Sequence, residues 1–299
     1  MDLFAPFTNI EPVTKGWSGD QKFCVTDADG AKSLLRIYPN GAAERLESMF
    51  ALLREVESLG VPMCELRESG KCDEGHYSLQ RWIEGEDLEP SLPLLSETEQ
   101  YELGWESGAI LRRIHSLPSA TTTEDWETRY SQKIDRNIRR YKECGVRFSD
   151  DALMVEYLQQ TRHLLRSRSQ CFQHGDYHVG NMMLEEGRLI IIDFDRFDFG
   201  DPWEEFNRIV WSATVSPHFA TGQLRGYFVG EPPLLFFQVM LMYIATNTLG
   251  AIPWAIPYGS AEVDTMLRQT QDVLHWFDDM KNPIPSWYLR DFVLQRREK

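Results

Sequence analysis

Two short stretches decide the fold of this 299-residue chain: residues 174–181 read His-Gly-Asp-Tyr-His-Val-Gly-Asn, and residues 190–195 read Ile-Ile-Ile-Asp-Phe-Asp. The first stretch places the carboxylate of Asp176 five positions before the carboxamide of Asn181. The second ends an apolar run at Asp193, 17 positions after Asp176. These three oxygen-bearing side chains are the first candidates for a functional site.

Between the two stretches the sequence predicts a β-hairpin over residues 182–192. A two-residue turn at Glu186-Gly187 would pair residues whose numbers sum to 373 (185 + 188), as a short hairpin loop requires. Continued to the hairpin ends, this register makes Asn181 and Asp193 cross-strand or diagonal neighbours. Mg²⁺ prefers oxygen ligands, so we expect these two side chains to bind one Mg²⁺.

The first stretch also has the spacing of a known catalytic loop. In kinases the pattern H-x-D-x-x-x-x-N, followed by a metal-binding Asp in D-F-G, positions and activates the attacking group. Asp176 is therefore predicted to accept the proton of a hydroxyl group as that hydroxyl attacks the γ-phosphate of a nucleotide. His174 is predicted to anchor the loop by packing and hydrogen bonding.

The segments outside these motifs differ in their predicted secondary structure. Residues 1–83 are β-rich and contain one amphipathic helix, whereas residues 84–299 are mostly helical. In the second segment, Ser96 and Glu99 form a capping box at the start of a helix over 96–115. The sequence predicts an α+β fold with a small N-terminal nucleotide-binding lobe, 1–83, and a larger C-terminal catalytic and substrate-binding lobe, 84–299.

The N-terminal segment offers groups for binding phosphate. The polar turn 15–23 contains Gly16, Ser18 and Gly19, whose backbone N–H groups are candidates for phosphate contacts. The sequence predicts a β-hairpin with strands 23–26 and 33–37 and a turn at Asp29-Gly30. Arg36, on the returning strand, is a candidate to grip phosphate oxygens through its planar guanidinium. Helical phase does not decide which acidic residue of the following helix would pair with Arg36; the candidates are Glu44, Glu47 and Glu55.

Nearly the whole chain resembles the aminoglycoside phosphotransferase family, small-molecule kinases with a protein-kinase-like fold in two lobes. The motifs H-G-D-x-H-x-G-N-M and I-D-F-D-x-x-x-x-G-D-P carry the resemblance, and Gly200-Asp201-Pro202 completes the second motif. By this resemblance Asp201 is the buried carboxylate that hydrogen-bonds the backbone of the catalytic loop. The sequence departs from the better-known members at Arg36, where they carry Lys.

The resemblance also implies roles for the other candidates. The donor would be ATP, or GTP, and the acceptor a small hydroxyl-bearing molecule such as an aminoglycoside or a similar cation. Asp176 would be the catalytic base, with Asn181 and Asp193 as Mg²⁺ ligands. The backbone at Arg81 and Ile83 would hold the adenine.

Composition excludes several classes of protein. With 31 Lys and Arg against 46 Asp and Glu, the net charge is −15, which disfavours nucleic acid as a partner. Five cysteines without metal-site spacing indicate reduced thiols and a cytoplasmic location. The stretch 232–261 carries no charge, but polar and proline residues interrupt it, so a buried helix and loop are expected, with no membrane partner. Nothing in the sequence indicates an oligomeric state.

Two other readings remain open on the sequence alone. His174, Asp176, His178 and Asp193 imitate a mixed metal cluster, which would suit a metal-dependent hydrolase. Arg36 in place of Lys would suit a kinase-like module that binds nucleotide without catalysis.

Overall fold

The structure is a computed structural model, and it describes residues 2–14, 19–39, 43–119 and 124–292. The chain divides into two compact units. The first comprises Met1–Asp87 and Met182–Asp195, and the second comprises Leu88–Asn181 and Arg196–Lys299. No pattern in the sequence indicates that Met182–Asp195 packs with the N-terminal segment, and the lobe boundary expected between residues 83 and 84 stays a prediction.

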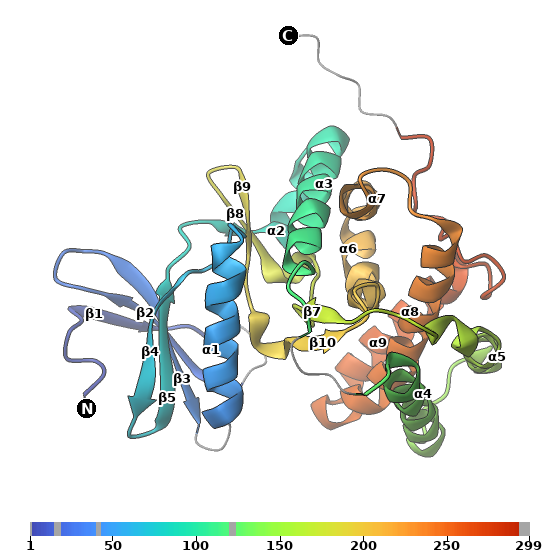
Figure 1. The fold of residues 1–299 in the computed structure, drawn as a ribbon, viewed down its shortest axis with the longest axis horizontal. Helices are drawn as coiled ribbons and strands as arrows, with labels where there is room; N and C mark the ends of the chain where they lie inside the picture. The colour runs from blue at the N-terminus through green and yellow to red at the C-terminus, as the bar shows by residue number, and fades with distance from the viewer. Residues whose placement is uncertain (1, 15–18, 40–42, 120–123, 293–299) are drawn as a thin grey trace, which may run out of the picture. The chain divides into compact units, whose positions relative to one another are not determined.

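The first unit is built on a five-stranded antiparallel sheet with the order β1-β2-β3-β5-β4 (Figure 1). Its strands are β1 Asn9–Pro12, β2 Gln21–Thr26, β3 Lys32–Pro39, β4 Leu66–Cys72 and β5 Gly75–Arg81. The predicted β2–β3 hairpin forms, with Phe23 opposite Leu35 and Gly30 in the turn at φ +83°. The edge strands β1 and β4 were not predicted, because they are short of buried apolar residues and so lack the alternation that marks a strand.

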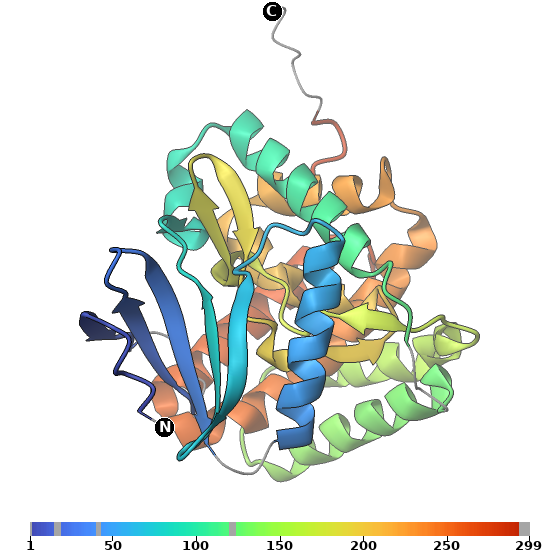
Figure 2. The same cartoon turned by 60° about the vertical axis from the view of Figure 1, so that its left-hand side comes forward.

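Both faces of the central strand β3 are covered (Figure 2). Leu35 and Ile37 pack into an apolar cluster with Leu3, Val25 and Tyr77. Side chains alternate along a strand, so Arg36 and Tyr38 point the other way, and Tyr38 contacts Phe50 of α1 (Ala43–Ser58). The predicted apolar stripe of this helix is buried throughout: Leu46, Met49, Phe50, Leu53 and Val56. Arg36 therefore lies on an interior strand beneath a helix.

The predicted hairpin is present in the first unit. Strands β8 (Met182–Glu185) and β9 (Arg188–Ile191) pair in the expected register, and β6 (Glu86–Asp87) adds a third strand beside β8. The ladder ends at Met182 opposite Ile191, so the expected continuation through Asn181 and Asp193 is wrong. Asn181 belongs to a 3₁₀ turn, η3 (Val179–Asn181), and Asp193 takes a left-handed conformation with φ +66°. Both conformations are incompatible with a regular strand.

The second unit is mostly helical, which confirms the predicted α+β class. Its α-helices are α2 Leu88–Ser91, α3 Glu97–Ile114, α4 Trp126–Glu143, α5 Asp151–Thr161, α6 Ile209–Val215, α7 Pro217–Phe228, α8 Leu234–Ala255 and α9 Ser260–Trp276. The 3₁₀ helices of this unit other than η3 are η1 Leu92–Leu94, η2 Arg162–Leu165, η5 Glu204–Arg208 and η6 Ile256–Tyr258, whereas η4 Phe194–Arg196 begins in the first unit and ends in the second. The capping box predicted at Ser96 and Glu99 is present at α3. Two three-residue strands, β7 (Cys171–Gln173) and β10 (Asp198–Gly200), pair with each other and were too short to predict.

The uncharged stretch predicted as a buried helix is α8. Among the described residues, Leu234–Tyr258 is the one helical segment long and apolar enough to cross a membrane, and 72% of its most apolar window is buried inside the structure. Its neighbours include α4, α5 and α9. The prediction of a buried helix is therefore confirmed, whereas the expected loop is wrong, because η6 (Ile256–Tyr258) follows α8 directly and α9 begins at Ser260.

Candidate active site

The predicted site residues belong to both units. Asp176 and Asn181 lie in the second unit, whereas Arg36, Arg81, Ile83 and Asp193 lie in the first. Gly16 and Ser18 lie outside the described residues, and Gly19 forms a bend just before β2.

The loop that carries Asp176 is held in shape by contacts to its backbone. Gly175 has φ +85°, and a Cβ atom there would lie 1.9 Å from the carbonyl oxygen of Arg196, so only glycine fits. The amide of Gly175 donates to Oε1 of Glu205 at 2.9 Å. At the other end, Nδ2 of Asn181 donates to the carbonyl oxygen of Asp176 at 2.9 Å. This last bond explains the five-residue spacing between Asp176 and Asn181.

The carboxylate of Asp176 is surrounded by cationic groups. Its Oδ1 lies 3.0 Å from Nε of Arg208 and 3.8 Å from Nε2 of His178, and its Oδ2 lies 3.6 Å from Nη1 of Arg196. Burial by itself would raise the pKa of Asp176. The neighbouring His178 and the charges of Arg208 and Arg196 outweigh burial and hold that pKa well below its usual range. Asp176 is therefore ionised at neutral pH.

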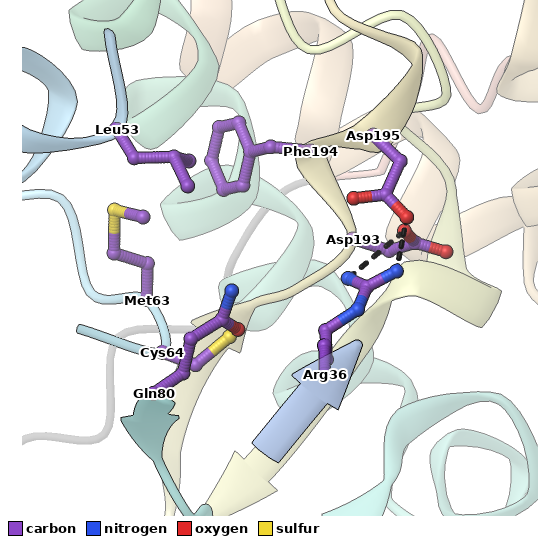
Figure 3. Close-up of a pocket in the computed structure, with 8 residues that line it drawn as sticks. All are labelled: Arg36, Leu53, Met63, Cys64, Gln80, Asp193, Phe194 and Asp195. Atoms are coloured by element: carbon purple, nitrogen blue, oxygen red, sulfur yellow. Dashed lines mark hydrogen bonds and ion pairs between the residues drawn. The ribbon is translucent and has the colours of Figure 1, made fainter. Parts of the chain in front are cut away.

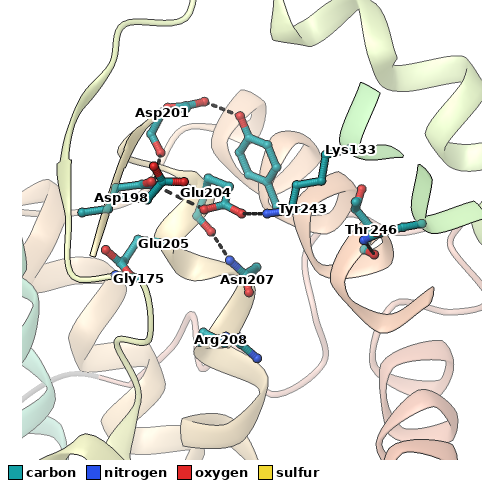
Figure 4. Close-up of polar contacts among 12 residues, drawn as sticks. Lys133, Gly175, Asp198, Asp201, Glu204, Glu205, Asn207, Arg208, Tyr243 and Thr246 are labelled. Carbon is teal, nitrogen blue, oxygen red and sulfur yellow. Dashed lines mark hydrogen bonds and ion pairs between the residues drawn. The ribbon is translucent and has the colours of Figure 1, made fainter. Parts of the chain in front are cut away.

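Asp201 does not have the role that the resemblance implied (Figure 4). Its carboxylate accepts hydrogen bonds from Nε and Nη2 of Arg168, from the amide of Trp203 and from the hydroxyl of Tyr243. The contact with the catalytic-loop backbone is made instead by Glu205, four positions later. The expectation for Asp201 was wrong because sequence alone does not show which of several buried acids faces the loop.

His174 has the packing and hydrogen-bonding role predicted for it. It is fully buried, its Nδ1 accepts from the amide of Asp176 at 3.3 Å, and its ring meets the Tyr177 ring edge-on. Tyr177 in turn donates to the carbonyl oxygen of Ser107 on α3 at 2.8 Å. These contacts anchor the loop to the helical core.

In the first unit, carboxylates surround Arg36 (Figure 3). Its side chain is only 6% exposed. Nε donates to Oδ2 of Asp20 at 2.7 Å, Nη2 contacts Oδ2 of Asp195, and Nη1 lies 4.0 Å from Oδ1 of Asp193. Within the described residues, none of the predicted partners Glu44, Glu47 and Glu55 forms an ion pair with Arg36.

Asp193 has the features of a cation ligand. Its Oδ1 is buried and has no hydrogen-bond partner among the described residues, and its backbone is held in the left-handed region. Asn181, for its part, uses Nδ2 within the loop, so Oδ1 is the atom of this side chain that would bind a cation. A carboxylate oxygen and an amide oxygen suit a hard cation such as Mg²⁺. Beside Asp193, burial raises the pKa of Asp195 to about 6 against the opposing charge of Arg36.

The two residues predicted to hold the adenine, Arg81 and Ile83, have different surroundings. The backbone N–H of Arg81 already donates to the carbonyl oxygen of Glu65 at 2.9 Å, and its side chain pairs with Glu185. Ile83 is buried in an apolar cluster with Cys64 and Ile190. The cavity that Arg36 and Cys64 help to line has room for about one water molecule, at about 10 Å³.

The described part of the chain contains no group of three or more His, Cys, Asp or Glu residues arranged to hold a metal ion. His174, which the hydrolase reading needs as a ligand, directs its Nδ1 to the amide of Asp176. The structure thus adds no support to that reading.

Residues 9–237 match the sequence profile described as the phosphotransferase enzyme family, APH, which covers more than half of the chain. The chain belongs to this family. It is therefore a phosphotransferase with a hydroxyl group as acceptor, that is, a small-molecule kinase. Among curated proteins, none matches it in sequence.

Solved structures show the same fold at low identity. A choline/ethanolamine kinase family protein from Mesorhizobium loti is 16% identical, with a TM-score of 0.69 over 95% of this chain and 94% of that protein. The aminoglycoside phosphotransferase APH(4)-Ia, solved with ADP and hygromycin B, is 17% identical, with a TM-score of 0.66 over 91% and 95%. Amicoumacin kinase hAmiN, solved with AMP-PNP, Ca²⁺ and Ami, is 14% identical, with a TM-score of 0.64 over 94% and 92%. The predicted protein-kinase-like fold is confirmed.

Several residues that contact the predicted site residues were not themselves predicted from the sequence. Arg196 and Arg208 face Asp176, Glu205 holds the loop, and Asp20 binds Arg36. Each lies at a distance in sequence that no motif spans. One available signal was Asp20 itself, a carboxylate in the glycine-bearing turn that the sequence had already singled out.

Proposed function

We propose that this phosphotransferase moves the γ-phosphate of ATP, or GTP, to a hydroxyl group of a small molecule, with Asp176 as the base and Asn181 and Asp193 as ligands of Mg²⁺. The observation that carries the proposal is the setting of Asp176: an ionised carboxylate on a loop closed by Asn181. The nucleotides and small molecules bound by similar structures support the same chemistry. When bound, Mg²⁺ would supply positive charge that offsets the phosphate oxygens.

The chain's own residues would act on the acceptor and on the nucleotide. Asp176 would accept a hydrogen bond from the acceptor hydroxyl and orient it. A carboxylate of such low pKa is a weak base, so it would take the proton only as the new O–P bond forms. Backbone amides of the turn at Gly16, Ser18 and Gly19 would contact phosphate oxygens. The amide of Arg81 is bonded to Glu65 and so is not available to the adenine. Of the two residues expected to hold the adenine, Ile83 therefore keeps its proposed place.

The test has two steps. Thermal shift with Mg·ATP, Mg·GTP and Mg·ADP measures nucleotide binding. ADP release is then measured with aminoglycosides, macrolides, choline, sugars and amino alcohols. We expect Mg·ATP to raise the Tm and at least one acceptor to stimulate ADP release. Asp176→Asn should abolish release and keep the thermal shift, and Asp193→Asn should weaken the shift. Asp198→Asn is the matched control, since the exposed Asp198 pairs with Arg129 and has no ion pair with the residues around Asp176 in the described part of the chain.

Three other outcomes would each contradict part of the proposal. Turnover that survives Asp176→Asn would remove Asp176 as the base. Nucleotide binding without turnover on the whole panel would favour the non-catalytic module, and tightly bound zinc would favour the hydrolase.

The proposal also places the enzyme in the cytoplasm, a location supported by its five free cysteines.

A further inference from the structure

The guanidinium of Arg36 is held on several sides by groups of its own unit. Nε is bonded to Asp20, Nη2 contacts Asp195, and the ring of Tyr38 lies 5.2 Å from the guanidinium carbon. A guanidinium that grips phosphate needs its planar fork aimed at the phosphate oxygens. The direction of that fork is set by whichever group holds Nε, because Nε lies in the same rigid plane as the two Nη atoms.

Asp20 is the group that holds Nε. Its side chain is 3% exposed, and its Oδ2 accepts from Nε at 2.7 Å. Asp20 directly precedes β2, and in the β2–β3 register Lys22 lies opposite Arg36. The contact therefore ties the polar turn that ends at β2 to the central strand β3. A carboxylate buried as deeply as that of Asp20 needs a cationic partner, and Arg36 is that partner.

The acidic residues of α1 are engaged elsewhere or have no ion pair with Arg36. Glu47, one of the three candidates on α1, lies 3.4 Å from Nζ of Lys71 and 3.8 Å from Nε2 of His76. In kinases a helix glutamate orients the strand cation. In this chain the carboxylate on that cation comes from the turn instead.

We propose that Asp20 is the positioning residue that fixes Arg36 for nucleotide binding, in place of a glutamate on α1. The proposal rests on the proposed function, because it assigns Arg36 to the nucleotide. Asp20 acts on the nucleotide through Arg36: it accepts from Nε and so keeps Nη1 and Nη2 directed toward Asp193, Asp195 and the phosphates of a bound nucleotide. A lysine at position 36 would lack the Nε donor and could not be oriented in this way.

The test is a double-mutant cycle on nucleotide affinity. The dissociation constant of Mg·ATP is measured by calorimetry for the wild type, Asp20→Asn, Arg36→Gln and the double variant. Asp20→Asn keeps the shape of the side chain and removes its charge, and we expect it to weaken Mg·ATP binding by roughly 10-fold. The double variant should bind no more weakly than Arg36→Gln alone, because the proposed effect of Asp20 on the nucleotide passes through Arg36. Glu47→Gln is the control and should bind as the wild type does.

A second variant covers the case in which Asp20→Asn does not fold. Asp20→Glu keeps the charge and moves it by one methylene, so it should fold, bind Mg·ATP more weakly than the wild type and retain the Tm of the free protein within a few degrees. Independent effects of the two sites, multiplying in the double variant, would overturn the proposal, as would wild-type affinity in both Asp20 variants. Failure of the wild type to bind Mg·ATP would overturn the proposed function, and this inference with it.

Discussion

Helices α3 and α7 meet through four glycines, and this contact gives a sharp test of the packing in the second unit. Gly104 and Gly108 lie on α3, and Gly222 and Gly226 lie on α7. A Cβ atom at Gly104 would lie 2.1 Å from the carbonyl oxygen of Phe219, and one at Gly222 would lie 2.2 Å from that of Tyr101. The opposing atoms are backbone, so no change of rotamer can make room for a methyl group.

The magnitude follows from these distances. Ordinary contact begins at 3.4 Å, so Gly104→Ala requires the two helices to separate locally by 3.4 − 2.1 = 1.3 Å. Overpacking of this kind costs about 1–3 kcal/mol, whereas replacing a helical glycine by alanine returns about 1 kcal/mol. With backbone on both sides we expect the upper end, a net loss of about 2 kcal/mol. That corresponds to a fall in Tm of roughly 4–8 °C.

The assay is thermal unfolding followed by circular dichroism for Gly104→Ala, Gly222→Ala and the double variant. One separation of the helices makes room for both methyl groups, so the double variant should lose less than the sum of the single losses. Glu102→Ala, at an exposed position of the same helix, should leave the Tm nearly unchanged. A Tm raised by Gly104→Ala, as helix propensity alone predicts, would refute the close approach, and full additivity would refute the shared displacement.

Three further predictions rest on buried groups. Asp201→Ala should lower the free energy of unfolding by about 3–5 kcal/mol, because it leaves Arg168 without its partner; denaturant unfolding measures this, and a loss below 1 kcal/mol would contradict it. Because the pKa of Asp176 in the folded protein lies below its ordinary 3.8, the ionised carboxylate stabilises the fold above about pH 4 and this stabilisation fades as the pH falls. The difference in Tm between the wild type and Asp176→Asn should therefore narrow below pH 4, and a constant difference from pH 7 to pH 3 would argue against the assigned ion pairs. Native thiol titration should leave Cys64 and Cys171 unreacted, since burial raises the pKa of Cys64 to about 11 and that of Cys171 further; rapid modification of all five thiols in the folded protein would be inconsistent with this.

Local patterns in the sequence predicted much of the fold. The capping box at Ser96, the apolar stripe of α1 and the β8–β9 register are each set by residues within a few positions of one another. The same holds for the catalytic loop, in which Asn181 bonds the backbone of Asp176 across five positions. Where cause and effect lie within one turn or one hairpin, the spacing of residues is enough.

The wrong predictions have two causes. A pattern was extended beyond the residues that produce it, or the residue that makes the contact lies far along the chain. The hairpin register was continued to Asn181 and Asp193, although the backbone leaves the ladder at Met182 and Ile191. The loop-binding acid was placed at Asp201, although Asp201 is fully engaged by Arg168, Trp203 and Tyr243. Both outcomes depend on tertiary contacts that no short window of sequence contains.

The arginine at position 36 is better understood with its contacts in view. On the sequence alone it was a departure from lysine, and it was the sole reason to consider a non-catalytic module. The chain also differs from the D-F-G of protein kinases in carrying Asp195 at the third position. The two residues that differ, Arg36 and Asp195, contact each other: Nη2 of Arg36 contacts Oδ2 of Asp195, and Nε of Arg36 donates to Asp20. An arginine offers more donors than a lysine, and this chain supplies the additional carboxylates that those donors need. Arg36 belongs to a matched set of buried charges, so the substitution by itself gives no reason to expect a loss of activity.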